Sequence, residues 1–279
     1  MFSRNYKPSA KLAPFLRGIY VFDAPLPETH VIDDFLLAET AFVRCLIKGD
    51  WRGGDAPEEL SAGGYALFSG ANSKPYKVRL TGSLYNVGFA IRPSGWRALF
   101  TQSHAEFADQ LLQLEDVWGN LAVTLFNEAK AAQTDEERIA IVEDSIIRRL
   151  DVIGVHEADE AMAKFEIIAR ENSTIRIDDA ADQIGVSVRS LERHCKHCFG
   201  LSPKAVLRRS RFLDMAAAIR GLSSPSDSAL AELRYFDESH LSKEFKRFSH
   251  MTPGQFKEAN TPLQTAGIKL REESRHKHQ

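Results

Sequence analysis

A segment of seventeen residues repeats itself fifty residues later, and this repeat constrains the fold more than any other feature of the chain. Ser187–Pro203 reads SVRSLERHCKHCFGLSP, and Asp237–Pro253 reads DESHLSKEFKRFSHMTP. Each copy opens with a Ser or Asp whose side-chain oxygen can accept the free amide protons of a first helical turn. Each closes at Ser-Pro or Thr-Pro, a hydroxyl N-cap followed by proline at the first helical position. The repeat therefore predicts two short basic helices, Val188–Phe199 and Glu238–Phe248, each followed by a new helix.

The residues around the repeat also predict helices, at Glu160–Glu171, Ile177–Ile184, Pro203–Arg220, Asp227–Leu233 and Pro253–Ala259. Gly185 and Val186 supply the tight turn of a helix-turn-helix unit. Pro203–Arg220 would form a rod of about 27 Å, close to one turn of DNA, about 34 Å. We therefore expect an all-α domain over residues 159–260, with two helix-turn-helix units joined by a long helix. Residues 261–279 are polar and predict a disordered tail.

The first hundred residues have strand character. Segments rich in β-branched and aromatic residues alternate with Gly, Pro and Asn turns, at Phe15–Phe22, Leu36–Lys48, Tyr65–Ser69, Lys77–Leu80 and Leu84–Ile91. Such a series predicts an antiparallel β-barrel or sandwich over residues 1–118. Helices are expected at Gly95–Phe100, Ala105–Leu112, Leu121–Ala132 and Asp135–Leu150. Residues 119–158 would then be a helical hairpin and linker, and the whole chain an α+β protein.

One of these helices carries a regular apolar stripe. Ile139, Val142, Ile146 and Leu150 recur at spacings of three and four residues, which places them on one face. The stripe has two possible roles. It either packs against the preceding helix or forms a dimerisation surface between two copies of the chain.

Charge is distributed unevenly between the two halves of the chain. Residues 1–170 carry 18 basic and 24 acidic side chains, whereas residues 186–220 carry eight basic and two acidic ones. The excess of positive charge coincides with the repeat, which favours a surface that binds a polyanion such as duplex DNA.

The helical pattern indicates which side chains would meet such a partner. Leu191 and Cys195 lie four residues apart and must face the core, so the opposite side faces out. In a helix-turn-helix the exposed residues near the start of the second helix contact base edges. Candidate base-contacting residues are Arg189, Ser190, Arg193, Ser239, His240 and Lys243. Candidate phosphate contacts are Lys196, Arg209, Lys246 and Arg247.

These segments resemble the DNA-binding domain of the AraC/XylS family of transcription regulators. The likeness is carried by LAELRYFDESHLSKEFKRFSHMTPGQF at residues 230–256 and by IDDAADQIGVSVRSLERHCKHCFGLSPKAVLRRSRF at residues 177–212. It implies base contacts at the six residues named above, a promoter as partner, contact with RNA polymerase, and a homodimer. The chain departs from the family at Arg234 and His250, where glycine is usual, and at Cys195, where phenylalanine is usual.

The N-terminal part is similar, more loosely, to the cupin-like sensor domain of such regulators, through Val87–Pro93 and Leu114–Trp118. This resemblance implies a small effector without naming it. Aromatic strand residues are expected in the interior, at Phe42, Tyr65, Phe68, Tyr85 and Phe89. If a cavity exists there, Arg44 is the candidate polar strand residue to line it.

Other classes of protein fit less well. His194-Cys195-Lys196-His197-Cys198 lies on one helix, where its four metal-ligating side chains cannot converge, and no second cysteine pair completes a zinc site. Residues 1–150 contain only His30 and His104, too few for a metal-dependent cupin. We expect no enzyme, no metal and no cofactor. The alternatives are a small-molecule-binding or enzymatic barrel whose helices mediate protein contacts, and a ligand-free regulator whose barrel only dimerises.

The composition also bounds the compartment. No run of about eighteen apolar residues could cross a membrane, and nothing near Met1 resembles a signal peptide. Three cysteines are too few for a disulfide framework. A cytoplasmic protein is therefore expected.

Overall fold

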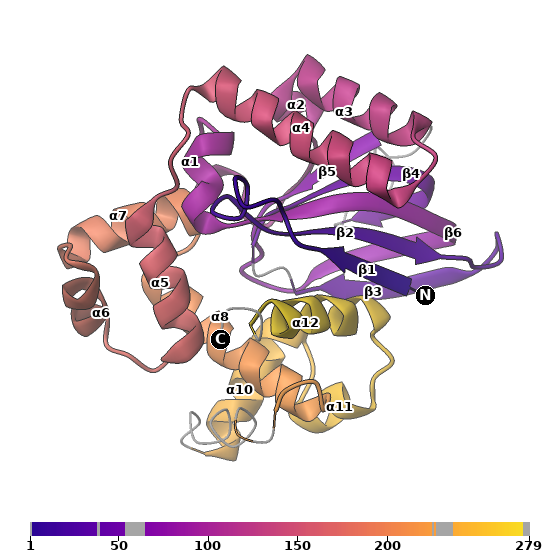
Figure 1. Ribbon diagram of the computed structural model, residues 1–279. Helices are drawn as coiled ribbons and strands as arrows, with labels where there is room; N and C mark the ends of the chain where they lie inside the picture. Colours follow the sequence, from indigo (N-terminus) through magenta and orange to yellow (C-terminus); the bar gives the residue numbers. More distant parts are fainter. Residues whose placement is uncertain (1, 38–39, 54–64, 225, 227–236, 276–279) are drawn as a thin grey trace.

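The computed structural model describes residues 2–37, 40–53, 65–224, 226 and 237–275 (Figure 1). The helix expected at Asp227–Leu233 and the departure from the family at Arg234 lie outside these described residues.

The N-terminal domain is built on one antiparallel sheet. Its strands are β1 (Phe2–Tyr6), β2 (Leu16–Ala24), β3 (Val31–Leu36), β4 (Phe42–Gly53), β5 (Tyr65–Ser69), β6 (Tyr76–Ile91) and β7 (Leu111–Gln113). They are arranged in the order β1-β2-β6-β4-β5-β7, and β3 also pairs with β6. The two strands expected at Lys77–Leu80 and Leu84–Ile91 form a single strand, β6. Gly82 lies inside it with a φ of +75°, so it changes the direction of the strand without ending it.

Side chains alternate between two buried faces of this sheet. Val43 and Cys45 of β4 point into a core shared with Phe68 and Phe89. Four helices cover this face: α1 (Trp96–Leu99), α2 (Glu115–Trp118), α3 (Asn120–Ala131) and α4 (Asp135–Ile153). The opposite face forms a second core that includes Tyr20, Trp51 and Leu80. In Figure 1, α2–α4 lie above the sheet.

The apolar stripe of α4 faces its own protomer. Val142, Ile146 and Leu150 are buried in the core beneath the helix, and Ile139 packs against that core. The helix is positioned by Thr134, whose hydroxyl forms a capping box with Glu137. Three of the four residues predicted to form a dimerisation face, Val142, Ile146 and Leu150, are therefore covered within their own protomer, whereas Ile139 stays partly exposed.

The C-terminal domain consists of helices α5 (Glu160–Glu171), α6 (Ile177–Ile184), α7 (Val188–Phe199), α8 (Pro203–Ile219), α10 (Glu238–Ser249), α11 (Pro253–Glu258) and α12 (Pro262–Arg275). In Figure 1, α8 and α10–α12 lie below the sheet, and α5–α7 lie to its left. The caps indicated by the repeat are present. Ser187 and Asp237 accept hydrogen bonds from the amides of Ser190 and His240, at 3.2 and 2.7 Å. Ser202 and Thr252 cap the helices that follow.

Two expected segments differ in the structure. The supposed tail at 261–279 contains α12, because Leu263 and Ile268 bury one side of an otherwise polar helix. The helix expected at Ala105–Leu112 is a single 3-10 turn, His104–Glu106, followed by β7, whose backbone pairs with β5. In both places the decisive partner is far away in the sequence.

Candidate nucleic-acid interface

Helix α7 presents a basic face to solvent. Arg189, Arg193 and Lys196 are exposed, and Ser190 is half-buried. The opposite side carries Leu191, Cys195, Cys198 and Phe199, all buried. Arg189 and Arg193 are one turn apart, so their guanidinium groups can reach neighbouring base edges in a major groove. The sequence therefore placed the exposed face of this helix correctly.

The two cysteines of α7 are core residues. Burial raises the pKa of Cys198 to about 12 and also raises the pKa of Cys195. Both thiols are therefore protonated at neutral pH, whereas metal ligation requires the thiolate. Within the described residues no group of three His, Cys, Asp or Glu side chains could hold a metal ion.

Helix α10 repeats the arrangement of α7. Ser239, Lys243, Lys246 and Arg247 are exposed, and His240 is half-buried. Lys243 stands fifty residues after Arg193, at the equivalent place on the exposed face. The six candidate base contacts thus divide into two similar sets, one on each helix.

Helix α8 holds these two helices together. The aromatic ring of Phe212 stacks on Phe248 at 5.2 Å and meets Phe245 edge-on at 5.0 Å. The guanidinium of Arg208 donates to the buried carboxylate of Glu244 on α10, with Nε 3.2 Å from Oε1. This charged contact fixes the rotation of α10 about its own axis relative to α8.

Arg209 is not on the DNA-facing surface. Its side chain is buried, with the residue 3% exposed, and its Nη1 donates to the carbonyl oxygen of Asn72 at 3.1 Å. The phosphate contact predicted for Arg209 is therefore corrected. The side of α8 that carries it packs against the sheet domain, which the helical pattern alone could not indicate.

The end of α7 is anchored to the sheet domain by His104. The imidazole stacks on the Trp96 ring at 3.9 Å between centroids. Its Nε2 accepts from the amide of Ala71 at 3.0 Å, so Nδ1 carries the hydrogen and donates to the carbonyl of Cys198 at 2.9 Å. Burial lowers the pKa of His104 to about 3. The ring is therefore neutral, as both hydrogen bonds require.

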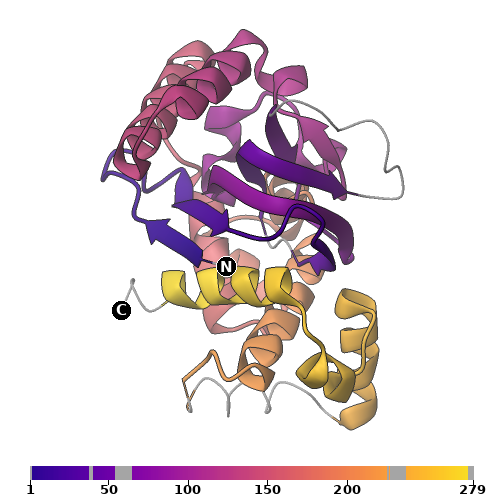
Figure 2. The same ribbon diagram turned by 90° about the vertical axis from the view of Figure 1, so that its right-hand side faces the viewer.

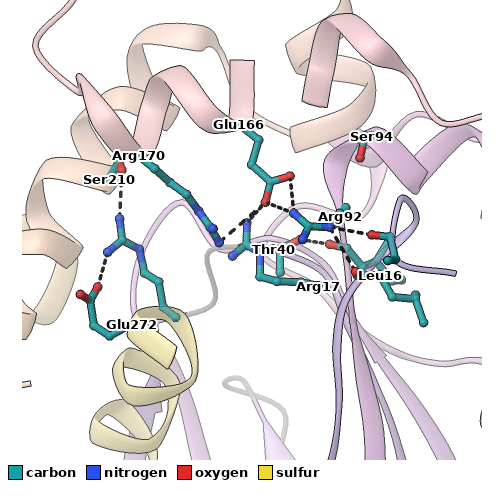
Figure 3. Close-up of polar contacts among 12 residues, drawn as sticks. Leu16, Arg17, Thr40, Arg92, Ser94, Glu166, Arg170, Ser210 and Glu272 are labelled. Carbon is teal, nitrogen blue, oxygen red and sulfur yellow. Dashed lines mark hydrogen bonds and ion pairs between the residues drawn. The ribbon is translucent and has the colours of Figure 1, made fainter. Parts of the chain in front are cut away.

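A buried charge cluster joins α5 to the sheet domain (Figure 3). The carboxylate of Glu166 lies 2.8 Å from Arg17, 3.2 Å from Arg92 and 3.8 Å from Arg170. Burial alone would raise the pKa of Glu166, but the three guanidinium charges outweigh it and hold that pKa below its usual range. The cluster thus fixes the first helix-turn-helix unit against β2 and the end of β6.

A cavity of about 100 Å³ lies between the second face of the sheet and the helical domain. Its walls are mostly apolar, and Arg44 of β4 is among them. The guanidinium of Arg44 lies 5.0 Å from the ring centroids of both Phe42 and Trp51. The residue is 9% exposed, and within the described part of the chain its buried Nη1 has no hydrogen-bond partner. A buried cationic donor in this state favours an anionic ligand.

Residues 180–259 match the helix-turn-helix domain family. No curated protein sequence matches the chain. Solved structures with low similarity include ToxT from Vibrio cholerae, at 11% identity and a TM-score of 0.47, covering 86% of this chain and 97% of that chain. ToxT bound to (E)-4-(8-methylnaphthalen-1-yl)but-3-enoic acid gives 10% identity and 0.44, covering 92% and 98%. The AraC-like transcriptional activator CuxR gives 13% and 0.25, covering 84% and 98%.

The family match, together with the capped basic helices α7 and α10 that both pack against α8, defines a DNA-binding transcriptional regulator. The residues that match this family lie in the C-terminal helical domain, which follows an N-terminal antiparallel sheet domain. In the described part of the chain no helix is both long and apolar enough to span a membrane.

Proposed function

We propose that α7 and α10 read two successive major-groove segments of one promoter duplex. The observation that supports this most directly is that Arg193 and Lys243 are both exposed, at equivalent places on two helices that each begin with a side-chain N-cap. Base contacts would come from Arg189, Ser190, Arg193, Ser239, His240 and Lys243. Lys196, Lys246 and Arg247 would contact phosphates.

The connecting helix sets the geometry of this reading. Helix α8 has 17 residues, which at 1.5 Å per residue is about 26 Å. One turn of B-DNA is about 34 Å. A single chain would therefore span two groove segments only if the duplex bends toward the protein, at a cost that depends on the DNA sequence.

The cavity would bind a small effector with an anionic group and an apolar body. Arg44 supplies the cation, and Phe22, Phe42 and Trp51 supply the apolar wall. A carboxylate or sulfonate on Arg44 would satisfy a buried donor that otherwise costs free energy. Dimerisation and contact with RNA polymerase remain predictions from the family resemblance.

Duplex binding tests the DNA proposal. Fluorescence anisotropy would compare DNA from upstream of the coding region with a scrambled duplex, at several salt concentrations. We expect a preference for the upstream duplex that persists at physiological salt. Absence of binding at low salt would contradict the proposal and favour the rival interpretation, in which the helices mediate protein contacts.

A fluorescent anion tests the cavity. 8-Anilinonaphthalene-1-sulfonate carries an anionic group on an apolar body, and Arg44→Met keeps the side-chain bulk but removes the charge. We expect about tenfold weaker binding of this probe to Arg44→Met. The matched control is Arg52→Met on the same strand, where Arg52 is more exposed and pairs with Asp50. Equal weakening in both variants would show that the probe responds to net charge and not to the cavity.

A further inference from the structure

Helix α12 contacts the sheet, the cavity and the helix-turn-helix core at once. Leu263 is buried in the second core of the sheet domain. Ile268, five residues later, is buried with Phe212 and Phe245 in the core of the C-terminal domain. Between them, Ala266 and Gly267 line the cavity. Figure 2 shows α12, in yellow, directly below the sheet, with α10 and α11 further below.

The N-terminus of α12 is capped by a residue of the sheet domain. Oδ2 of Asp34, on β3, accepts from the amide of Leu263 at 2.7 Å, and the carboxylate also accepts from the amide of Gln264. Asp34 is buried, at 3% exposure. A helix cap normally comes from the residue just before the helix. Here it is supplied from 229 residues earlier in the chain, and it places a carboxylate at the positive end of the helix dipole.

The other end of α12 is fastened to α8 and to β1. The buried guanidinium of Arg271 lies 2.8 Å from Asp214 and donates to Ser210 at 3.1 Å, both on α8. Its Nη1 also donates to Oε1 of the neighbouring Glu272 at 2.8 Å. Glu273 accepts from Asn5 of β1 at 2.6 Å. The helix is thus held at both ends, and each domain contributes to the holding.

We propose that α12 is an interdomain strap whose docking is coupled to occupancy of the cavity. The sheet forms one wall, and Leu213 of α8 together with α12 forms the other. The cavity exists only while the strap is docked, so a ligand that touches both walls binds the docked state alone. Such a ligand stabilises docking by mass action. By reciprocity, a weaker strap lowers the affinity for the ligand. This coupling rests on the proposed effector site.

The strap would act on the second helix-turn-helix unit. Ile268 shares a core with Phe245 of α10 and Phe256 of α11. The turn before α12 is also tied to α8, because Arg220 donates to Ala259 O at 2.9 Å and to Thr261 Oγ1 at 2.6 Å. Docking of α12 therefore fixes α10 and α11 against the sheet, and release of α12 loosens them.

Amide hydrogen exchange on the full chain, followed by mass spectrometry, tests the strap without any ligand. Asp34→Ala removes the cap, and we expect the amides of α12 to exchange about fivefold faster. Asp33→Ala is the matched control, since Asp33 is exposed and pairs with Arg79. Gly267→Ala adds a better helix former where a Cβ meets nothing within 4 Å. It should slow exchange in α12 severalfold.

The same experiment with 8-anilinonaphthalene-1-sulfonate tests the coupling. In the wild type the probe should slow exchange in α12 and in α10–α11, and Asp34→Ala should bind the probe severalfold more weakly than Asp33→Ala does. Protection confined to the sheet, or undiminished binding to Asp34→Ala, would overturn the coupling.

Failure of the strap can be separated from failure of the effector site. If the probe does not bind the wild type, the effector site is wrong and the coupling falls with it, while the exchange rates without ligand still decide whether α12 is a strap. Should Asp34→Ala fail to fold, as judged by near-ultraviolet circular dichroism, Gly267→Ala decides alone. Unchanged exchange in α12 of that variant would then overturn the strap.

Discussion

The two helix-turn-helix units are alike in sequence pattern but are held against the sheet domain in different ways. Gly200 and His250, fifty residues apart, end α7 and α10 in the same left-handed conformation, with φ of 72° and 60°. At Gly200 a Cβ would lie 3.2 Å from the carbonyl oxygen of His104, so the backbones nearly touch. His250 instead reaches out with its ring and meets Phe35 of β3 edge-on at 5.7 Å.

The rest of the contacts follow the same division. The first unit is fixed by buried polar groups inside the protein, namely His104 and the Glu166 cluster. The second depends on α12, a helix that lies beyond it in the chain. The comparison indicates that the first unit is held rigidly against the sheet domain, whereas the position of the second unit can change with the docking of α12.

The largest effect is expected at His104. His104→Ala removes a ring stacked on Trp96 and leaves the carbonyl of Cys198 without its donor. We expect a loss of about 3–5 kcal/mol in the free energy of unfolding, measured by urea denaturation. His250→Ala, at the corresponding joint of the second unit, should cost less than about 1 kcal/mol. Similar losses in both variants would contradict the division into a fixed and an adjustable unit.

The pH dependence of stability provides a second test at His104. Its pKa is about 3 when folded and about 6.5 in the unfolded chain, so the unfolded state binds the proton more tightly. The stability conferred by the neutral ring is complete above pH 6.5. It declines as pH falls from 6.5 toward 3, by at most about 1.4 kcal/mol per pH unit. Urea denaturation between pH 8 and pH 4 should show this slope in the wild type and a flatter one in His104→Ala.

Base reading should be divided between the two units. Arg193→Ala should weaken binding to the preferred duplex by about 1–3 kcal/mol, because a bidentate contact to guanine is lost. Lys243→Ala should cost less, because an ammonium makes no bidentate fork. Anisotropy with duplexes altered in one half of the site would show which half each variant ceases to distinguish. A uniform loss on every duplex would reassign either residue to the phosphates.

Substitutions at Gly200 and His250, which end α7 and α10 in a left-handed backbone conformation, should change the stability of the fold in opposite directions. Gly200→Ala places a Cβ in a strained conformation against His104 and should destabilise the fold by about 1–2 kcal/mol. His250→Gly relieves the same strain and should be neutral or stabilising by up to about 1 kcal/mol. Thermal unfolding of the two variants would compare them. A clear loss in His250→Gly would mean that the contact with Phe35 outweighs the strain.

The smallest effect is expected for the phosphate contacts. Lys246→Ala should weaken binding to all duplexes alike and reduce the slope of log K against log salt by about 1. Lys196→Ala is the equivalent change in the first unit and should behave in the same way. A sequence-dependent effect of either substitution would show that the lysine contacts a base.

The sequence predicted the helices and strands whose boundaries are set by residues nearby in the chain, and missed those that depend on distant partners. Helices α5, α6 and α7 begin and end where expected, because caps such as Ser187 and the glycine at 185 lie within or beside them. Strands β1 and β3 were missed, since each is defined by its pairing with a distant strand. The prediction of the exposed face of α7 was correct because, like the helix boundaries, it depends on residues within the helix itself.

The site was predictable where a helix keeps one face exposed and not where it is buried on several sides. Arg193 faces solvent because Leu191 and Cys195, on the opposite side of α7, are buried. Helix α8 is buried on several sides, so its pattern could not show that Arg209 faces Asn72. Arg44 stood out as a charge on an apolar strand, but its place in a cavity depends on helices far along the chain. The sequence did not indicate that Asp34 caps a helix, because Leu263, whose amide donates to it, lies 229 residues away.

The position of α12 in the chain has a consequence for how the protein is made. Every residue of the sheet wall precedes residue 87, whereas Leu263 and Arg271 come after both helix-turn-helix units. Domains generally fold as units while synthesis proceeds from the N-terminus. During synthesis the sheet domain would thus emerge and fold, with its cavity face open, well before the helix that covers this face has been made. Because the proposed ligand binds only the docked state, a nascent chain would gain its complete effector site only once α12 has been synthesised.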